Sequence, residues 1–111
     1  MKTHKMKLVD FAFNKINNKE KDIELRLNDD KRKQINIGDI IEFEHIDTHE
    51  IIRTQVTNLY RYSTFKEIFN NFDFRRFGLE NNDYNVMYSF YTKEEENKYG
   101  VLGIEIKLIN F

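Results

Sequence analysis

The order in which strand patterns and helix patterns follow one another constrains the fold of this chain more than any other feature of its sequence. Strand patterns, most of them alternating apolar and polar residues, occur in five segments: 6–8, 22–28, 40–43, 51–59 and 101–109. Helical spacing occurs in three segments: 10–18, 64–72 and 84–100. The resulting order, β-α-β-β-β-α-α-β, has too few βαβ units for a doubly wound sheet. It predicts an α+β fold, a small partly closed β-barrel with flanking helices.

Capping residues support the predicted helices. Asp10 can begin the first helix, which we expect to end near Asn18. Thr64 and Glu67 have the spacing of a capping box at the start of the second, and Gly78 is a plausible C-terminal cap. The two central strands, separated by a short polar segment, are expected to pair as a hairpin.

Length and composition limit the possible classes of protein. The chain has 111 residues, which predicts one domain over 1–111, and its ten Phe and six Tyr can supply a core. It contains no cysteine, so a disulfide framework and a cysteine metal site are excluded. No apolar run approaches the roughly 20 residues that span a bilayer, and the N-terminus lacks the apolar stretch of a signal peptide. We therefore expect a cytoplasmic protein with no membrane partner.

The formal net charge of the chain is −1. Proteins that cover long stretches of DNA or RNA are usually basic, because neutralising phosphates releases counterions and drives binding. A near-neutral chain argues against a large nucleic-acid footprint. It leaves room for a compact pocket that binds one nucleotide or a short single strand.

The charged strand from Lys21 to Arg26 is the first candidate for a functional site. Its even positions carry Glu24 and Arg26 on one face, roughly 6.6 Å apart, while Lys21 enters from the preceding loop. Lys21 and Arg26 can bind a phosphate or a carbonyl, and Glu24 can accept from an exocyclic amine or act as a base. The plainer alternative is a solvated strand face with an ion pair, and spacing alone favours it.

Resemblance to a known family changes this balance. The resemblance rests on four segments: Lys21-Asp22-Ile23-Glu24-Leu25-Arg26, Asn28-Asp29-Asp30-Lys31-Arg32, Ile37-Gly38-Asp39-Ile40-Ile41-Glu42-Phe43 and the tail 99–106. Together they resemble the ASCH domain (activating signal cointegrator homology) of the PUA-like superfamily, whose hallmark is Gly-x-Lys-x-x-Glu-x-Arg. The tail looks like the closing strand of small bacterial members. The resemblance covers nearly the whole chain and implies a β-barrel, a cleft beside the motif, and roles in RNA binding or RNA metabolism.

The motif positions bear on possible chemistry. Lys21, Glu24 and Arg26 occupy its Lys, Glu and Arg positions, whereas Lys19 replaces its glycine with a bulky cation. One branch of the family consists of acetylcytidine amidohydrolases with a lysine, a threonine nucleophile and a distant glutamate. Lys21 matches that lysine, but Glu24 stands in place of the threonine, and a carboxylate cannot replace the attacking hydroxyl. Other members are ribonucleases, in which Lys21 and a nearby Tyr or Arg would stabilise a pentavalent phosphate without metal.

The resulting functional prediction is a nucleotide- or RNA-recognition module. Lys21, Glu24 and Arg26 are expected in the cleft, with Arg32 and Tyr99 at its rim. The alternative is a small hydrolase acting on a modified nucleoside or on RNA, with Lys21 and Glu24 as candidate catalytic residues. A protein-interaction domain is a third, plainer possibility. No cofactor is expected, and whether the chain is an enzyme stays open.

Two weaker patterns are interpreted structurally. His45 and His49 lie four residues apart but fall in a predicted hairpin loop, where that spacing does not place them on one face, so no metal site is expected. Three tyrosines with helical spacing can stack on bases, but a core-facing stripe is the commoner meaning of that pattern. They are Tyr84, Tyr88 and Tyr91.

Overall fold

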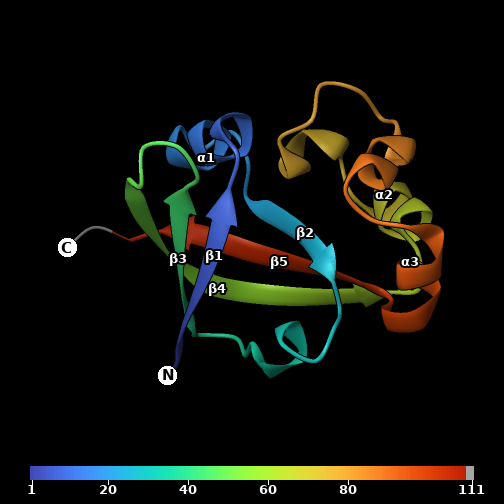
Figure 1. Ribbon diagram of the computed structural model, residues 1–111, viewed down its shortest axis with the longest axis horizontal. Helices are drawn as coiled ribbons and strands as arrows, with labels where there is room; N and C mark the ends of the chain where they lie inside the picture. The colour runs from blue at the N-terminus through green and yellow to red at the C-terminus, as the bar shows by residue number, and fades with distance from the viewer. Residues whose placement is uncertain (110–111) are drawn as a thin grey trace.

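The computed structural model describes residues 1–109, which form a curled five-stranded sheet with helices at its two ends (Figure 1). The strands are β1 (Thr3–Leu8), β2 (Ile23–Leu27), β3 (Ile40–His45), β4 (Ile51–Tyr62) and β5 (Val101–Leu108). Their order across the sheet is β1-β3-β4-β5-β2. β1 and β3 run parallel, and all other neighbours are antiparallel. The predicted α+β fold and the predicted hairpin, formed by β3 and β4, are confirmed.

The sheet is a partly closed barrel whose seam lies between its edge strands β1 and β2. The twelve-residue strand β4 pairs with β3 through its first half and with β5 from Thr54 to Tyr62, and a bulge between Val56 and Asn58 bends it. This curvature brings β1 and β2 towards each other. A side chain crosses the seam: Nη2 of Arg26 donates to the carbonyl oxygen of Lys7 at 3.0 Å.

Helices fill the remaining space. The α-helices are α1 (Asp10–Asn17), α2 (Phe65–Asn71) and α3 (Lys93–Tyr99), and the 3-10 helices are η1 (Arg32–Gln34), η2 (Phe74–Phe77) and η3 (Tyr84–Ser89). In Figure 1, α1 lies over one end of the sheet, while the segment from α2 to α3 covers the other. No helix within residues 1–109 is long and apolar enough to cross a membrane.

Two apolar clusters hold these layers together. The first packs α1 against the sheet through Phe13 and Ile16, which meet Phe43 of β3. The second packs the segment 65–91 against β2, with Ile23 and Phe65 fully buried. The seam therefore lies between two separately packed ends of the molecule.

Several element boundaries differ from the sequence prediction. The α2 helix ends at Asn71, so Phe72 follows it in extended backbone instead of completing a helical stripe. Gly78 is a C-terminal cap, as predicted, and has the left-handed conformation, but the helix that it caps is η2. The tyrosine-rich segment is a 3-10 helix, and the Asp83 carboxylate caps its start by accepting from the N–H of Asn85. β4 extends to Tyr62 because it keeps pairing with β5 to the first residue of that strand.

Candidate functional site

The turn after α1 fixes the position of Lys21. The N–H of Lys19 donates to the carbonyl of Ile16 at 3.0 Å, and the N–H of Glu20 donates to that of Lys15 at 2.8 Å. These two bonds are those of a Schellman motif, whose C′ residue is usually a glycine in the left-handed conformation. Lys19 occupies that position with φ 63°. Lys19 stands where the sequence motif Gly-x-Lys-x-x-Glu-x-Arg has its glycine. Its backbone therefore keeps the left-handed conformation that favours glycine.

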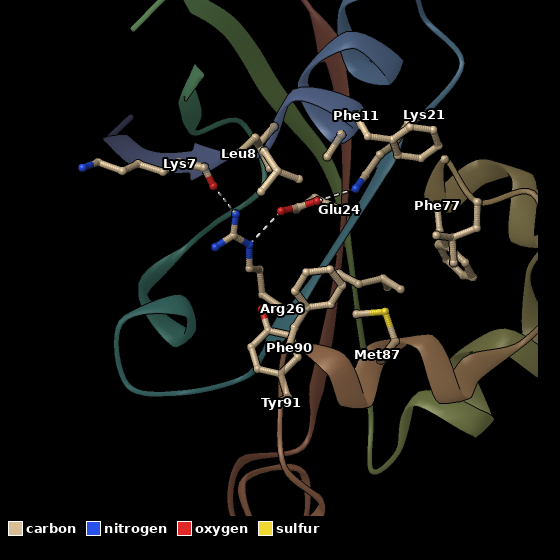
Figure 2. A pocket seen from close by; sticks show the side chains of 15 residues that line it. Lys7, Leu8, Phe11, Lys21, Glu24, Arg26, Phe77, Met87, Phe90 and Tyr91 are labelled. Atoms are coloured by element: carbon tan, nitrogen blue, oxygen red, sulfur yellow. Dashed lines mark hydrogen bonds and ion pairs between the residues drawn. The ribbon is translucent and has the colours of Figure 1, made fainter. Parts of the chain in front are cut away.

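Lys21, Glu24 and Arg26 form one ion-paired set, which we call the charged row (Figure 2). Nζ of Lys21 lies 2.7 Å from Oε1 of Glu24, and Nε of Arg26 lies 2.7 Å from its Oε2. The Glu24 side chain is only 5% exposed. The sequence prediction that these three residues lie together is matched by this geometry, but the row is buried at the seam and does not form a solvated strand face.

The charged row holds its central carboxylate ionised. Burial alone would raise the pKa of Glu24, but the adjacent charges of Lys21 and Arg26 and their hydrogen bonds lower it to about 2. Burial by itself would also lower the pKa of Arg26, and the Glu24 charge raises it instead. Because both carboxylate oxygens already accept from cations, Glu24 is a weak general base at neutral pH. The row as a whole carries one net positive charge.

A cavity of about 240 Å³, the seam cavity, opens over the charged row. Its other lining residues come from β1, α1, β2, η2, η3 and the loops beside them: Lys7, Leu8, Val9, Phe11, Ala12, Leu25, Phe77, Gly78, Leu79, Met87, Phe90 and Tyr91. Phe11 and Phe90 are largely exposed at its mouth. In Figure 2 these two rings lie on opposite sides of the row. The site thus combines apolar, partly aromatic walls with a charged floor.

Tyr91 adds a polar group to the aromatic wall. Its ring stacks on Phe65 at 5.8 Å between centroids, which fixes its orientation. Burial raises the pKa of its phenol, so the hydroxyl stays protonated at neutral pH. Tyr91 belongs to the tyrosine stripe that the sequence assigned to the core, and it serves both the core and the cavity.

The loop at Gly78 packs directly against Lys21. A Cβ atom on Gly78 would lie 2.9 Å from Cδ of Lys21, so only glycine leaves room for the lysine stem. The preceding residues are tied to the barrel by Arg76, which donates to Asp22 at 3.0 and 3.1 Å and to Glu105 at 2.8 Å. These contacts hold the wall of the cavity over the charged row.

Arg32 lies in a second cavity of about 430 Å³ that adjoins the first, which we call the basic groove. Its lining residues are Lys5, Met6, Lys7, Arg26, Lys31, Arg32, Glu42, Glu44 and Ile51. The short helix η1 presents Arg32 here, because the Asp29 carboxylate accepts from the Arg32 backbone N–H at 3.0 Å and from its Nη1 at 3.2 Å. Arg32 is therefore next to the charged row but outside the seam cavity.

Tyr99 lies apart from both cavities. It is the last residue of α3, packs against the second apolar cluster, and has Nζ of Lys98 5.1 Å from its ring centre. The aromatic residues that line the seam cavity are instead Phe11, Phe90 and Tyr91, with Phe77 deeper in the wall. No single local pattern groups these rings in the sequence, because Phe11, Phe77 and the pair Phe90-Tyr91 come from three separate parts of the chain.

The histidines have structural partners. Nε2 of His45 lies 2.8 Å from the Asp10 carboxylate, and its Nδ1 accepts from the N–H groups of Asp47 and Thr48. His49 lies 2.8 Å from Glu44. Residues 1–109 contain no group of three His, Cys, Asp or Glu side chains that could hold a metal ion. His45 thus holds the start of α1 against the hairpin.

Comparisons with known proteins agree with this architecture. The family model of the ASCH domain matches residues 6–110. The crystal structure of hypothetical protein PH0355 is 35% identical, with a TM-score of 0.85 over 98% of this chain and 100% of that one. The solution structure of protein PF0455 from Pyrococcus furiosus is 31% identical, with a TM-score of 0.77 over 98% of this chain and 99% of that one. ZmASCH from Zymomonas mobilis, 10% identical with a TM-score of 0.70 over 97% and 73% of the two chains, shares the fold. No curated protein matches the sequence.

Proposed function

Because this chain belongs to the ASCH domain family, whose members are generally proposed to bind RNA, we propose that it is a nucleotide- or RNA-recognition module whose seam cavity holds one nucleobase. The observation that carries the proposal is the charged row on the floor of an apolar cavity. A base has the matching character, since its faces are apolar and aromatic and its edge is polar.

The hydrogen-bond donors that remain free in the charged row determine which polar edge of a nucleobase it can recognise. Glu24 has both oxygens occupied, so its role is to order Lys21 and Arg26. Lys21 keeps two further N–H groups, because an ammonium has three donors and the ion pair uses one. We infer that the base presents acceptors, a carbonyl oxygen or a ring nitrogen, to Lys21 and Arg26. This replaces the expectation that Glu24 accepts from an exocyclic amine.

Aromatic side chains at the mouth support binding of a planar ring. Phe11 and Phe90 are 49% and 65% exposed at the seam cavity, where contact of apolar surface with water costs free energy that a stacked base would recover. Base–aromatic stacking contributes about 1–3 kcal/mol per base. Stacking of this kind tolerates every base, so discrimination rests on the charged row.

Titration of the intact chain with the four ribonucleosides and with short RNA oligonucleotides tests the proposal. Isothermal calorimetry or NMR shifts give the affinities of the wild type, Lys21→Met and Phe90→Ala. We expect each substitution to weaken binding by about tenfold or more: Lys21→Met loses a hydrogen bond from a charged group, worth ~1.5–3 kcal/mol, and Phe90→Ala loses base stacking, worth about 1–3 kcal/mol. Lys66→Met is the matched control, because Lys66 is exposed on α2 and lines neither cavity.

Equal affinity in the wild type and in Lys21→Met would reject the proposal, as would no binding of any nucleoside or oligonucleotide. Thermal unfolding of each variant checks that the fold persists. Phe90→Ala is the safer variant in this respect, because its largely exposed ring contributes little to the core.

A hydrolase is the second candidate, with Lys21 and Glu24 as its candidate catalytic residues. The unused N–H groups of Lys21 favour it, because they can stabilise charge that develops on a reacting oxygen. Glu24 opposes it, because its lowered pKa and double ion pair make it a weak base. Incubation with N4-acetylcytidine and with short RNAs, followed by chromatography, separates the candidates. Absence of turnover, or equal turnover by Lys21→Met, would exclude the hydrolase.

A further inference from the structure

The basic groove has an excess of positive charge. Five of its lining residues are cations and two are acids. Both acids have partners of their own: Glu42 lies 3.3 Å from Nε of Arg53, and Glu44 lies 2.8 Å from Nδ1 of His49. Within residues 1–109, the groove lysines Lys5, Lys7 and Lys31 form no ion pair. The groove therefore has cationic groups that are not neutralised by direct partners in the described chain.

Arg26 joins the groove to the seam cavity. It lines both, as does Lys7, so the two cavities share a wall. Two of its nitrogens are committed, Nε to Glu24 and Nη2 to the Lys7 carbonyl, which leaves Nη1 for a ligand. Figure 2 shows this guanidinium beside Lys7, on the side of Glu24 that is opposite Lys21. A ligand that fills the seam cavity can therefore extend across Arg26.

Arg32 provides a second guanidinium. Its Nη1 is fixed by Asp29, whereas its Nε is enclosed and has no hydrogen-bond partner within the described part of the chain. Buried donors are nearly always satisfied, so an unmatched one in a cavity wall is notable. The groove is thus lined by two guanidinium groups held by protein partners and by three lysines that form no ion pair in the described chain.

We propose that the basic groove binds a phosphate group that is covalently attached to the nucleoside in the seam cavity. This rests on the function proposed above and narrows the ligand class to a phosphorylated nucleotide unit. A phosphate offers the groove three acceptor oxygens and a negative charge, which arginine forks and lysine ammonium groups bind well. The apolar seam cavity is unsuited to that group, because a buried phosphate without enough donors pays a large desolvation cost. Base and phosphate therefore occupy separate cavities on either side of Arg26.

The test compares each ribonucleoside with its 5′- and 3′-monophosphates, using the intact chain and calorimetry at low salt. In the wild type, at least one monophosphate should bind about tenfold more tightly than its nucleoside, from one or two charge-assisted hydrogen bonds. In Lys5→Ala/Lys31→Ala this gain should fall to less than about threefold, while nucleoside affinity stays unchanged. Lys33→Ala is the control: it removes one positive charge from η1, half of the change in the double variant, at a residue that does not line the groove.

The outcomes separate this inference from the proposed function. Nucleoside binding with no gain from phosphate, or with a gain that survives in Lys5→Ala/Lys31→Ala, would overturn the phosphate site and leave base recognition intact. Binding of monophosphates that is lost in the double variant, with no binding of nucleosides, would support the phosphate site in the groove and overturn base recognition. Loss of the phosphate gain in Lys33→Ala to the same extent would also overturn the site, because it would show a general charge effect.

Discussion

Two clusters of charged residues flank the start of β2, and they differ in their access to water. The charged row is nearly enclosed, with the Glu24 side chain 5% exposed. The other, the outer cluster, consists of Asp22, Tyr60, Arg76 and Glu105, and its Asp22 side chain is 48% exposed. Both use short ion pairs, with nitrogen–oxygen distances of 2.7–3.0 Å. Their chemistry is similar, so burial is what separates their roles.

The outer cluster fastens one part of the fold to another. Arg76 reaches from η2 to Asp22, 54 residues away along the chain, and to Glu105 on β5. The charged row instead holds two cations rigidly beside a cavity. Water screens the charges of the outer cluster but has little access to the charged row. Only the charged row therefore keeps a strong electrostatic field that a ligand would meet. Ion pairs at neighbouring positions along the chain thus join two parts of the fold on one side and order two cations beside a cavity on the other, the side to which we assign recognition in our proposal.

Removing the central carboxylate should give the largest effect. Glu24→Gln leaves the buried cations without their counter-ion, and we expect a loss of about 3 kcal/mol in the free energy of unfolding at pH 7. Glu105→Gln in the outer cluster should cost about 1 kcal/mol, because its partners remain partly solvated. Urea unfolding of the two variants measures both values. Equal losses would show that burial does not separate the clusters.

Acid should weaken the charged row over a defined range of pH. The pKa of Glu24 in the folded chain, about 2, is below its ordinary value of 4.5. Stability from this ionised carboxylate is therefore complete above pH 4.5 and is lost as the pH falls towards 2. The stability difference between the wild type and Glu24→Gln should shrink over that range in urea titrations. A difference that is constant from pH 5 to pH 2 would contradict the assigned ion pairs.

Crowding Lys21 should disturb the row without changing any charge. Gly78→Ala places a Cβ within 3.0 Å of the lysine stem at φ +77°, and we expect a cost of about 2 kcal/mol together with weaker nucleoside binding. Gly38→Ala is the control, because Gly38 has φ +94° but no atom within 4 Å of the added Cβ. Backbone strain alone should cost ~1 kcal/mol there and leave binding unchanged. Equal effects on binding would exclude a positioning role for Gly78.

The smallest effect is expected at the turn before the row. Lys19→Gly relieves a left-handed lysine, which costs ~1–2 kcal/mol, but adds ~0.5–1 kcal/mol of chain entropy to the unfolded state. The net gain should be about 0.5 kcal/mol, measured as a higher urea midpoint. Nucleoside affinity should not change, because the Schellman bonds already hold this backbone shape. A loss of stability would show that the Lys19 side chain makes a contribution larger than its strain.

Much of the fold followed from local patterns. The alternation in Ile23–Leu27 and Val101–Leu108 predicted strands, and Thr64 with Glu67 predicted the start of α2. These patterns succeed because burial on one face imposes a period of 2 on strands and 3.6 on helices. The boundary errors arose at Phe72 and at the 3-10 helix η3. In both, partly buried aromatic rings satisfy the apolar pattern without the α-helical backbone that the pattern suggested.

The candidate site was predicted less completely. Family resemblance placed Lys21, Glu24 and Arg26 together, and these three are joined in the charged row. Composition gave no means of assigning Arg32 to the basic groove, or of choosing Tyr91 over Tyr99 as the cavity tyrosine. Those choices depend on which loops lie beside the seam, and neighbouring residues in the sequence do not encode that.

The sequence by itself determined the faces of the strands and the starts of α1 and α2, because these depend on contacts within a few residues. Only the tertiary structure decided that the charges of β2 lie at a seam. There β1, α1 and the segments near residues 77–79 and 87–91 meet them and exclude water. The strength of a charge's electrostatic interactions depends on how much water surrounds it, and here the residues that exclude water come from distant parts of the chain. For this reason the strand that looked solvated became a buried row with one net positive charge.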